Sequence, residues 1–243
     1  MKPKVSCYCP TYGKSKLLEE AIYSFLNQDY DGEKELVILN DLVDQTLIFD
    51  HPQVKIINSK QRIYPLGKKL NECLSYCSGE YIFVWDDDDI YFPWKISFSI
   101  NNINKDGIFH TNQAFFEEIN KTLSISKNLF HSNLCMHKNI WENNNYIESD
   151  VIALDVFLFN KINYLYKNIS KIISDEDIFY IYRWSSTSNY HGSFFKENVS
   201  LNVAKYVDQK ILNKTEPVGN IVLNPQWKND YFQARKNCLQ NQK

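Results

Sequence analysis

The chain has 243 residues, of which 44% are hydrophobic and 15% aromatic, a composition typical of a globular protein rather than a disordered one. Lysine and arginine number 27 against 29 aspartates and glutamates, so the net charge of −2 excludes a general electrostatic attraction to nucleic acid or anionic membrane. No segment has the roughly 18 consecutive apolar residues of a spanning helix, and the N-terminus MKPKVSCYCP has no apolar signal segment. We therefore expect a cytoplasmic protein without a transmembrane segment, and leave peripheral membrane contact and the oligomeric state open.

Six cysteines are scattered along the chain without the paired C-x-x-C spacing of zinc sites. Cys7 and Cys9 alternate on a predicted strand, and Cys73 and Cys77 lie one helical turn apart. Nothing in this spacing indicates an oxidising compartment, so we expect buried free thiols.

The N-terminal part of the chain alternates between strand-like and helix-like patterns. Four short apolar runs are typical of buried strands, at residues 4–9, 35–41, 54–59 and 81–85. Two stretches have apolar residues at helical spacing, at 14–28 and 66–77. This alternation predicts an α/β fold with a mainly parallel sheet flanked by helices, in which ligands bind beyond the carboxyl ends of the strands. Three of those ends carry residues suited to binding, at Pro10-Thr11-Tyr12, Asn40-Asp41 and Asp86.

The pattern changes near residue 105. A helix is expected after Pro93, and beyond Gly107 aromatic-rich stretches predict antiparallel strands at 108–119 and 121–126. Further helices are predicted at 138–144 and 150–161, and further strands at 164–170 and 178–184. We divide the chain into residues 1–105, residues 106–185 of the same domain, and a C-terminal extension, 186–243, for which no definite structure is predicted.

Four consecutive carboxylates, Asp86 to Asp89, follow the strand predicted at 81–85. Neighbouring like charges raise one another's pKa and oppose folding unless a positive group neutralises them. A solvated acidic loop is the ordinary explanation of a charge run, but this run lies between an apolar strand and the aromatic segment IYFPW. Mg²⁺ and Mn²⁺ prefer such oxygen ligands, completed by water and phosphate oxygens. We therefore predict a divalent-metal site at this strand end.

Four segments in this order resemble the motifs of inverting GT-A glycosyltransferases of the family 2 type: CPTYGKSKLLEEAIYSFLNQDY, ELVILND, LGKKLN, and GEYIFVWDDDD followed by proline. The resemblance covers about residues 4–95 and is weak beyond them. It implies a GT-A, Rossmann-like fold with a smaller antiparallel sheet on the acceptor side. In that arrangement residues 1–105 form the half that binds a nucleotide-sugar donor, and residues 106–185 the half that binds the acceptor.

The resemblance also implies roles for residues of the donor half. Pro10, Thr11 and Tyr12 would line the base pocket, and Asp41 would accept a hydrogen bond from the imide N–H of the base. A lysine of LGKKLN would approach the diphosphate or the base, with Lys69 preferred to Lys68. A packed loop, a helix cap and a solvated helix face are the structural alternatives for these residues.

The family's D-x-D pattern falls on Asp86 and Asp88, with Asp86 nearer the ribose and Asp88 nearer a bound Mn²⁺ or Mg²⁺. Asp87 and Asp89 are additional carboxylates, and a shift of one residue leaves the direct metal ligand open between Asp88 and Asp89. His191 is a further candidate ligand, since imidazole is compatible with Mn²⁺.

Inverting transfer requires a carboxylate on the acceptor side to remove a proton from the attacking hydroxyl. The family places it at the start of a helix, and ESDVIALDVFLFNKI offers Asp150 and Asp155. Asp150 is preferred because Ser149-Asp150 suits a helix N-terminus, although the family's Glu-Asp pattern is absent.

Three residues of the acceptor half have a binding and a structural interpretation each. Arg183 would contact phosphate or brace the fold. Trp141 and Trp184 could stack on an acceptor sugar, but core packing is the preferred interpretation for both.

The resemblance thus implies a metal-dependent inverting glycosyltransferase that uses a nucleoside diphosphate sugar. UDP is the expected nucleotide, and polysaccharide biosynthesis is an expected process. The acceptor would be a hydroxyl of a glycan, a lipid-linked glycan or a protein. A catalytically silent nucleotide-sugar-binding module is the alternative from another class. A nucleotidyltransferase is less favoured, because the first loop has only Gly13 and no glycine-rich phosphate loop.

Overall fold

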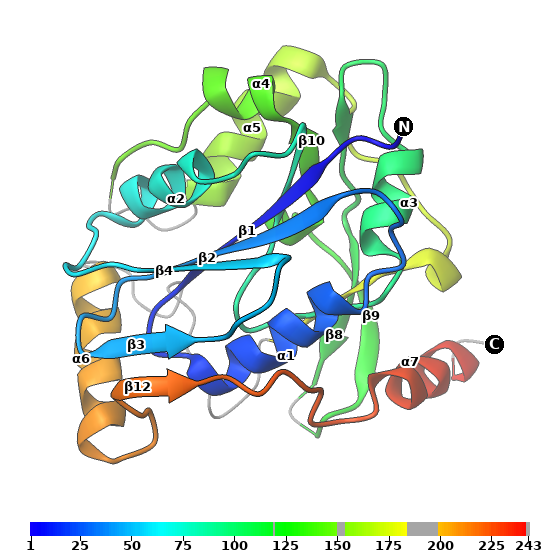
Figure 1. Ribbon diagram of the computed structural model, residues 1–243. Coiled ribbons are helices and arrows are strands. Elements are labelled where there is room, and N and C mark those ends of the chain that lie inside the picture. Colours follow the sequence, from blue (N-terminus) through cyan, green and yellow to red (C-terminus); the bar gives the residue numbers. More distant parts are fainter. Residues whose placement is uncertain (119, 150–153, 184–198, 242–243) are drawn as a thin grey trace.

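The computed structural model describes residues 1–118, 120–149, 154–183 and 199–241. Its main sheet has six strands in the order β4-β2-β1-β5-β10-β7 (Figure 1). Four of them are parallel: β1 (Val5–Thr11), β2 (Lys34–Asn40), β4 (Val54–Asn58) and β5 (Tyr81–Val84). β10 (Cys135–His137) runs antiparallel to both β5 and β7 (Ile108–Phe109). The predicted mainly parallel sheet and its four predicted strands are therefore confirmed.

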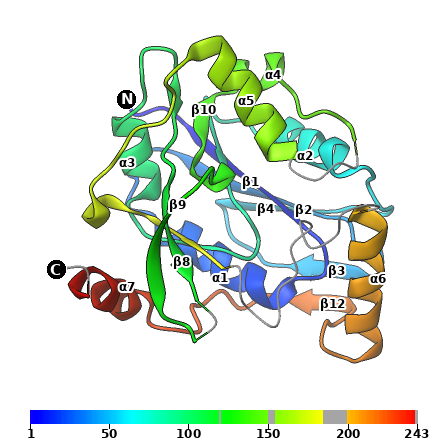
Figure 2. The same ribbon diagram turned by 180° about the vertical axis from the view of Figure 1, so that it is seen from behind.

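Alternate residues of β1 point to two separate cores, as the period of a strand requires. Cys7 and Cys9 pack with α1 (Ser15–Leu26), whereas Tyr8 packs in the second core. That second core lies beneath α2 (Leu66–Ser75), α4 (Lys138–Asn143) and α5 (Leu154–Tyr166). Figures 1 and 2 show these three helices on one face of the sheet and α1 on the other.

A second sheet has the order β6-β11-β8-β9 and stands against α1 and α3 (Lys95–Asn101). Its strands are β6 (Ile90–Tyr91), β11 (Tyr180–Tyr182), β8 (Gln113–Glu117) and β9 (Leu123–Lys127). β8 and β9 are antiparallel as predicted, while β11 joins β8 in parallel. Two short 3₁₀ turns connect elements of the fold: η1 (His131–Asn133) lies between β9 and β10, and η2 (Asp175–Asp177) lies between α5 and β11.

The strand predicted at 164–170 is wrong, because α5 continues to Tyr166. Leu158, Phe159 and Ile162 form a buried helical face, so packing overrides the strand preference of Tyr-Leu-Tyr. The helix ends where Lys167 takes a positive φ of 52°.

The C-terminal extension folds back onto the donor half. It contains α6 (Val199–Leu212), β12 (Gly219–Val222) and α7 (Tyr231–Gln240). β12 pairs in parallel with β3 (Gln45–Ile48), a short strand that the sequence pattern did not reveal. In Figures 1 and 2, α6 lies beside β3 and β12, at the side of the molecule opposite α7.

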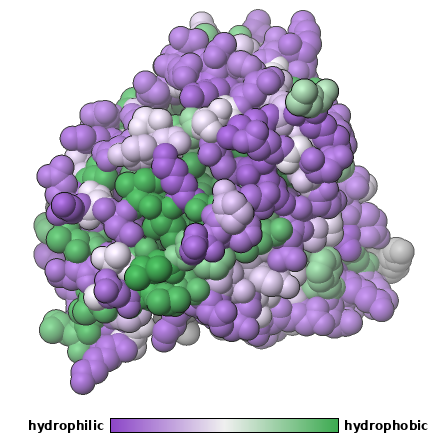
Figure 3. Space-filling model, viewed as in Figure 1, coloured by the Kyte–Doolittle hydropathy of each residue, from purple (hydrophilic) through white to green (hydrophobic). Residues whose placement is uncertain are grey.

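Figure 3 shows apolar residues gathered on the side of one face where β3, β4 and β12 lie. Ile48 and Val222 are paired in the β3–β12 ladder and are 41% and 75% exposed. No helix among the described residues is both long and apolar enough to cross a bilayer. All six cysteines are buried free thiols, as predicted.

Candidate active site

Three neighbouring parallel strands bring the first, second and fourth motifs to one edge of the main sheet. β1 lies between β2 and β5, and Thr11 at the end of β1 pairs with Asn40 at the end of β2. Tyr12, Asp41 and the acidic run follow these strands in the chain. This is the edge at which α/β sheets bind ligands.

Asp41 is fully buried and is held by two cationic side chains and a backbone amide. Lys69 Nζ lies 2.6 Å from Asp41 Oδ1 and 2.6 Å from the carbonyl oxygen of Thr11. Arg62 Nη1 and the Ile63 N–H both donate to Oδ2, the amide at 2.9 Å. Burial lowers the pKa of Lys69, while the charge of Asp41 counteracts that change. Lys69 therefore connects the first two motifs from inside the fold, on the base side of the predicted site.

The ring of Tyr12 lies against the same group. The guanidinium carbon of Arg62 is 3.8 Å from the ring centre, a cation–π contact. Tyr12 also packs with Leu42, Val203 and Val207, of which the last two belong to α6. The predicted base pocket is thus bordered by Arg62 and by the C-terminal extension.

The first three carboxylates of the acidic run contact two side chains, Ser132 and Lys14. Ser132 Oγ donates to Asp86 Oδ2. Asp87 and Asp88 both contact the ammonium group of Lys14, whose Nζ lies 3.4 Å from Asp87 Oδ1 and closer still to Asp88 Oδ2. Lys14 is therefore a counter-ion for the middle of the run.

Asp89 is turned into the protein. It is 1% exposed, and its two oxygens accept hydrogen bonds from the Tyr180 hydroxyl at 2.5 Å and the Arg183 N–H at 2.8 Å. Because both oxygens are engaged internally, the geometry favours Asp88 over Asp89 as the direct metal ligand.

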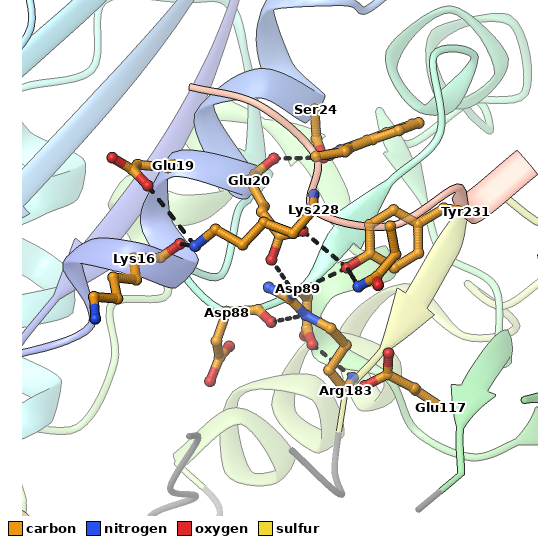
Figure 4. A network of polar contacts seen from close by, with 12 residues as sticks. Lys16, Glu19, Glu20, Ser24, Asp88, Asp89, Glu117, Arg183, Lys228 and Tyr231 are labelled. Carbon is orange, nitrogen blue, oxygen red and sulfur yellow. Dashed lines mark hydrogen bonds and ion pairs between the residues drawn. The ribbon is translucent and has the colours of Figure 1, made fainter. Parts of the chain in front are cut away.

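Arg183 braces the acidic turn, the second of its two predicted roles (Figure 4). Its Nε donates to the Asp88 carbonyl oxygen, and its Nη1 lies 2.6 Å from Glu20 Oε2 and 3.2 Å from the Tyr231 hydroxyl. Glu20 in turn accepts from the Tyr231 hydroxyl and the Lys228 N–H, each at 2.9 Å. The turn, α1 and the C-terminal extension are thereby joined in one network.

The acidic run is incompletely neutralised by its surroundings. Burial raises the pKa of Asp86 and of Asp87 to about 6, and the charge of Asp88 adds to both shifts. Beneath the run, the buried Lys95 Nζ donates to the carbonyl oxygens of Val84 at 2.9 Å and Ser132 at 2.8 Å. Burial lowers the pKa of Lys95 to about 7, so this lysine compensates the carboxylates only in part at neutral pH.

These residues fit a hard divalent cation as part of its coordination shell. No group of three or more His, Cys, Asp and Glu side chains is arranged for a metal among the described residues. Asp86 and Asp88 supply only carboxylate oxygens, and burial raises the pKa of Asp86, with the charge of Asp88 adding to the shift. That set suits Mg²⁺ or Mn²⁺, which take their remaining ligands from water and phosphate oxygens.

Asp155, one of the two candidate bases, lies in the first turn of α5. Burial is the larger influence on two nearby groups, lowering the pKa of His131 and raising that of Tyr182. The charge of Asp155 raises the pKa of both. The charges of Asp89 and Asp88 also raise the pKa of Tyr182. The charges of Asp155 and of the acidic run thus act on the pKa of Tyr182 in the same direction.

Three predicted residues, Asp150, Trp184 and His191, lie outside the described residues. Lys68 is exposed on α2, away from the contacts that Lys69 makes. Trp141 is 2% exposed and packs edge-on against a tyrosine of β1, which agrees with its preferred core interpretation.

Sequence reasoning missed Lys14 and Arg62 as site residues. Lys14 follows Tyr12 by two positions, so its place at the sheet edge could have been found from the motif. Arg62 lies between β4 and α2, in a segment without a recognisable pattern, and only the fold brings it to Tyr12.

A cavity of about 430 Å³ lies beside these groups. Lys14 and Arg183 line it from the side of the acidic turn, and Lys210, Lys228 and Tyr231 line it from the C-terminal extension. None of the four carboxylates of the acidic run lines it, so the cavity adjoins the run through Lys14 and Arg183.

A mainly parallel sheet with a smaller second sheet, and an acidic run at its carboxyl edge, defines the GT-A class of glycosyltransferases. The model of Glycosyl transferase family 2 matches residues 6–163. Since this match covers more than half of the chain, the chain belongs to that family.

Curated relatives agree with this membership. The putative glycosyltransferase EpsE of Bacillus subtilis is 31% identical over 111 residues, which cover 42% of this chain and 39% of that protein. The GalNAc(5)-diNAcBac-PP-undecaprenol beta-1,3-glucosyltransferase of Campylobacter jejuni is 32% identical over 111 residues, covering 42% and 35%. An uncharacterized glycosyltransferase of Haemophilus influenzae is 27% identical over 237 residues, covering 88% and 71%. The matching segment thus spans well under half of the first two relatives.

Solved structures share the fold. The mannosyltransferase PcManGT from Pyrobaculum calidifontis, in complex with GDP-Man and Mn²⁺, has a TM-score of 0.58 at 16% identity, covering 100% of this chain and 69% of that chain. S. aureus TarS 1–349 in complex with UDP-GlcNAc has a TM-score of 0.55 at 19% identity, covering 86% and 67%. At these identities the likeness establishes the fold alone.

Proposed function

We propose that this chain is a metal-dependent inverting glycosyltransferase that moves a sugar from a nucleoside diphosphate sugar to a hydroxyl group of a glycan, lipid-linked glycan or protein. The observation that carries the proposal is the meeting of Tyr12, Asp41 and the acidic run at one edge of the sheet. An aromatic ring and a buried carboxylate suit a nucleobase, and carboxylates at the carboxyl edge of the sheet suit a metal-bound diphosphate.

UDP is the proposed nucleotide, with GDP as the first competitor. An imide N–H such as that of uracil would require an acceptor, and Asp41 supplies one at the end of β2. Support also comes from TarS, solved with UDP-GlcNAc, and from PcManGT, solved with GDP-Man. Because Lys69 occupies Asp41 Oδ1 and Arg62 and the Ile63 N–H both donate to Oδ2, base binding at Oδ2 requires the guanidinium to move and the Ile63 N–H to share that oxygen.

Different residues of the chain would have different roles in the transfer reaction. Asp86 and Asp88 would hold Mg²⁺ or Mn²⁺, which when bound neutralises charge on the departing nucleoside diphosphate. A carboxylate at the start of α5 would remove the proton of the acceptor hydroxyl as its oxygen attacks the anomeric carbon. Attack from the face opposite the leaving group inverts the configuration without a covalent enzyme intermediate.

Calorimetric titration with UDP, GDP, CDP and dTDP, each with Mn²⁺ and with EDTA, tests the proposal. We expect metal-dependent binding of one nucleotide to the wild type and its loss in Asp88→Ala. Asp50→Ala is the matched control, since Asp50 is an exposed carboxylate outside the site. Absence of binding for all four nucleotides in the folded wild type would overturn the proposed function.

A further inference from the structure

The C-terminal extension is attached to the loop between β1 and α1, where the donor site begins. Glu216 Oε1 accepts from the Ser15 N–H at 3.0 Å and from Gln45 Nε2 at 2.9 Å. These bonds add to the β12–β3 pairing. The segment after α6 is therefore fixed to the donor half by buried polar contacts as well as by a strand pair.

Gly13 shows how closely α6 approaches that loop. It has a φ of +63°, and a Cβ built on it would lie 2.5 Å from Val207 Cγ1. Because Tyr12 and Lys14 flank this glycine, the position of α6 determines how both residues are presented to the site.

Lys210 extends from α6 to the same loop. Its Nζ donates to the Gly13 carbonyl oxygen at 3.3 Å and lies 3.9 Å from Glu216 Oε2, with 15% of the side chain exposed. Burial lowers the pKa of Lys210, Glu216 raises it, and smaller effects come from Lys14 and Asp87. Lys210 is thus within electrostatic reach of both the acidic run and its counter-ion.

The cavity beside these residues has an excess of positive charge, although the whole chain carries a net charge of −2. Three glutamates line it against six cationic residues, which are Lys14, Lys16, Lys121, Arg183, Lys210 and Lys228. The charge of Lys14 lowers the pKa of Lys210, so the two ammonium groups repel each other unless an anion lies near both. Asp87 and Asp88 of the acidic run supply such an anion to Lys14.

We propose that the C-terminal extension completes the donor site and that Lys210, beside Lys14, binds the diphosphate group of the nucleotide sugar. This inference rests on the proposed function. Asp88 would hold a divalent cation, and with that carboxylate engaged the diphosphate would be the anion that both Lys14 and Lys210 contact. Glu216 acts as a positioning residue that keeps the Lys210 ammonium group at the loop.

The test compares UDP with uridine, because only UDP presents a diphosphate, by calorimetry with Mn²⁺ on Lys210→Met. A lost hydrogen bond to a charged group costs about tenfold or more in affinity, so we expect that loss for UDP and less than about twofold for uridine. Lys205→Met is the matched control, since Lys205 is exposed on the same helix and does not line the cavity. If the wild type selects guanine, GDP and guanosine replace this pair.

The outcomes separate this inference from the proposed function. Binding of UDP to Lys210→Met within about twofold of wild type would overturn the inference and leave the function intact, as would an equal loss of UDP and uridine. A wild type that binds no nucleoside diphosphate would overturn both. If Lys210→Met does not unfold cooperatively, Lys210→Gln replaces it, because its amide removes the charge but can still donate to Gly13.

Discussion

The guanidinium carbon of Arg62 lies 3.8 Å from the centre of the Tyr12 ring, so a cation covers the aromatic residue predicted to stack on a base. The same guanidinium donates to Asp41, which has Lys69 as its second cationic partner. The two partners differ in burial, since the side chain of Arg62 is 29% exposed and that of Lys69 only 3%. One buried carboxylate thus allows the two contributions to be compared directly.

Lys69→Met should destabilise the protein more than Arg62→Met. Removing Lys69 takes a fully buried charge from Asp41 and a donor from Thr11, which should cost about 3–5 kcal/mol. Removing Arg62 should cost about 1–2 kcal/mol, because solvent can replace part of that contact. Urea unfolding at pH 7 measures both, with Lys68→Met as the exposed control on α2. Equal losses would contradict the assigned difference in burial.

Tyr12→Ala should weaken nucleotide binding. Stacking of a base on an aromatic side chain contributes about 1–3 kcal/mol, so affinity should fall about 5- to 150-fold. Tyr12→Phe keeps the ring and should stay within about threefold of the wild type. Calorimetry with the nucleotide that the wild type binds measures this, and thermal unfolding checks the contacts with Leu42 and Val207. Unchanged affinity in folded Tyr12→Ala would exclude stacking on this ring.

Much of the donor half could be predicted from the sequence, because its strands are short apolar runs that end at distinctive residues. Tyr12, Asp41 and Asp86 follow three such runs, and parallel pairing alone then brings them to one edge. Their contacts could not be predicted, since Arg62 reaches Asp41 only through the path of the chain after β4. The same limit applies to Lys69, which is expected at the diphosphate or the base and whose side chain lies between Thr11 and Asp41.

The C-terminal extension was less accessible to prediction. β12 pairs with β3, which lies far away in the sequence, and both strands have only four residues. A signal for α6 was nevertheless present, because Val203 and Val207 lie one helical turn apart and both are buried. The start of α7 also has a recognisable cap, in which the Asp230 side chain accepts from the Gln233 N–H.

Asp87→Asn should stabilise the metal-free protein at neutral pH. Burial raises the pKa of Asp87 from 3.8 to about 6, so the folded state binds the proton more tightly than the unfolded state between these values. The wild type therefore loses stability as pH rises toward 6, and the asparagine variant does not incur this loss. Its advantage should be about 2 kcal/mol larger at pH 7.5 than at pH 4. Urea unfolding in EDTA checks this, with the exposed Asp50→Asn as the control; a pH-independent difference between the wild type and Asp87→Asn would contradict it.

Lys95→Met should show the opposite trend with pH. Burial lowers the pKa of Lys95 from 10.5 to about 7, so above pH 7 the unfolded state binds more protons than the folded state. Wild-type stability from this group therefore rises with pH, and the methionine variant lacks that rise. The free energy of unfolding of the wild type should rise relative to that of the variant by about 2 kcal/mol from pH 7 to pH 9. If the free energies of unfolding of wild type and variant change in parallel from pH 7 to pH 9, Lys95 is charged in the folded state.

Asp155→Asn should slow transfer and leave donor binding intact, if the base is the carboxylate in the first turn of α5. Asparagine keeps the shape of the side chain but cannot accept the acceptor's proton, so kcat should fall by about 10²- to 10⁴-fold. Release of nucleoside diphosphate from the bound donor, with a panel of glycan and lipid-linked acceptors, measures the rate, and calorimetry measures donor affinity. Asp150→Asn is the paired variant. An active Asp155→Asn beside an inactive Asp150→Asn would assign the base to Asp150, whereas wild-type rates in both would remove the base from this segment altogether.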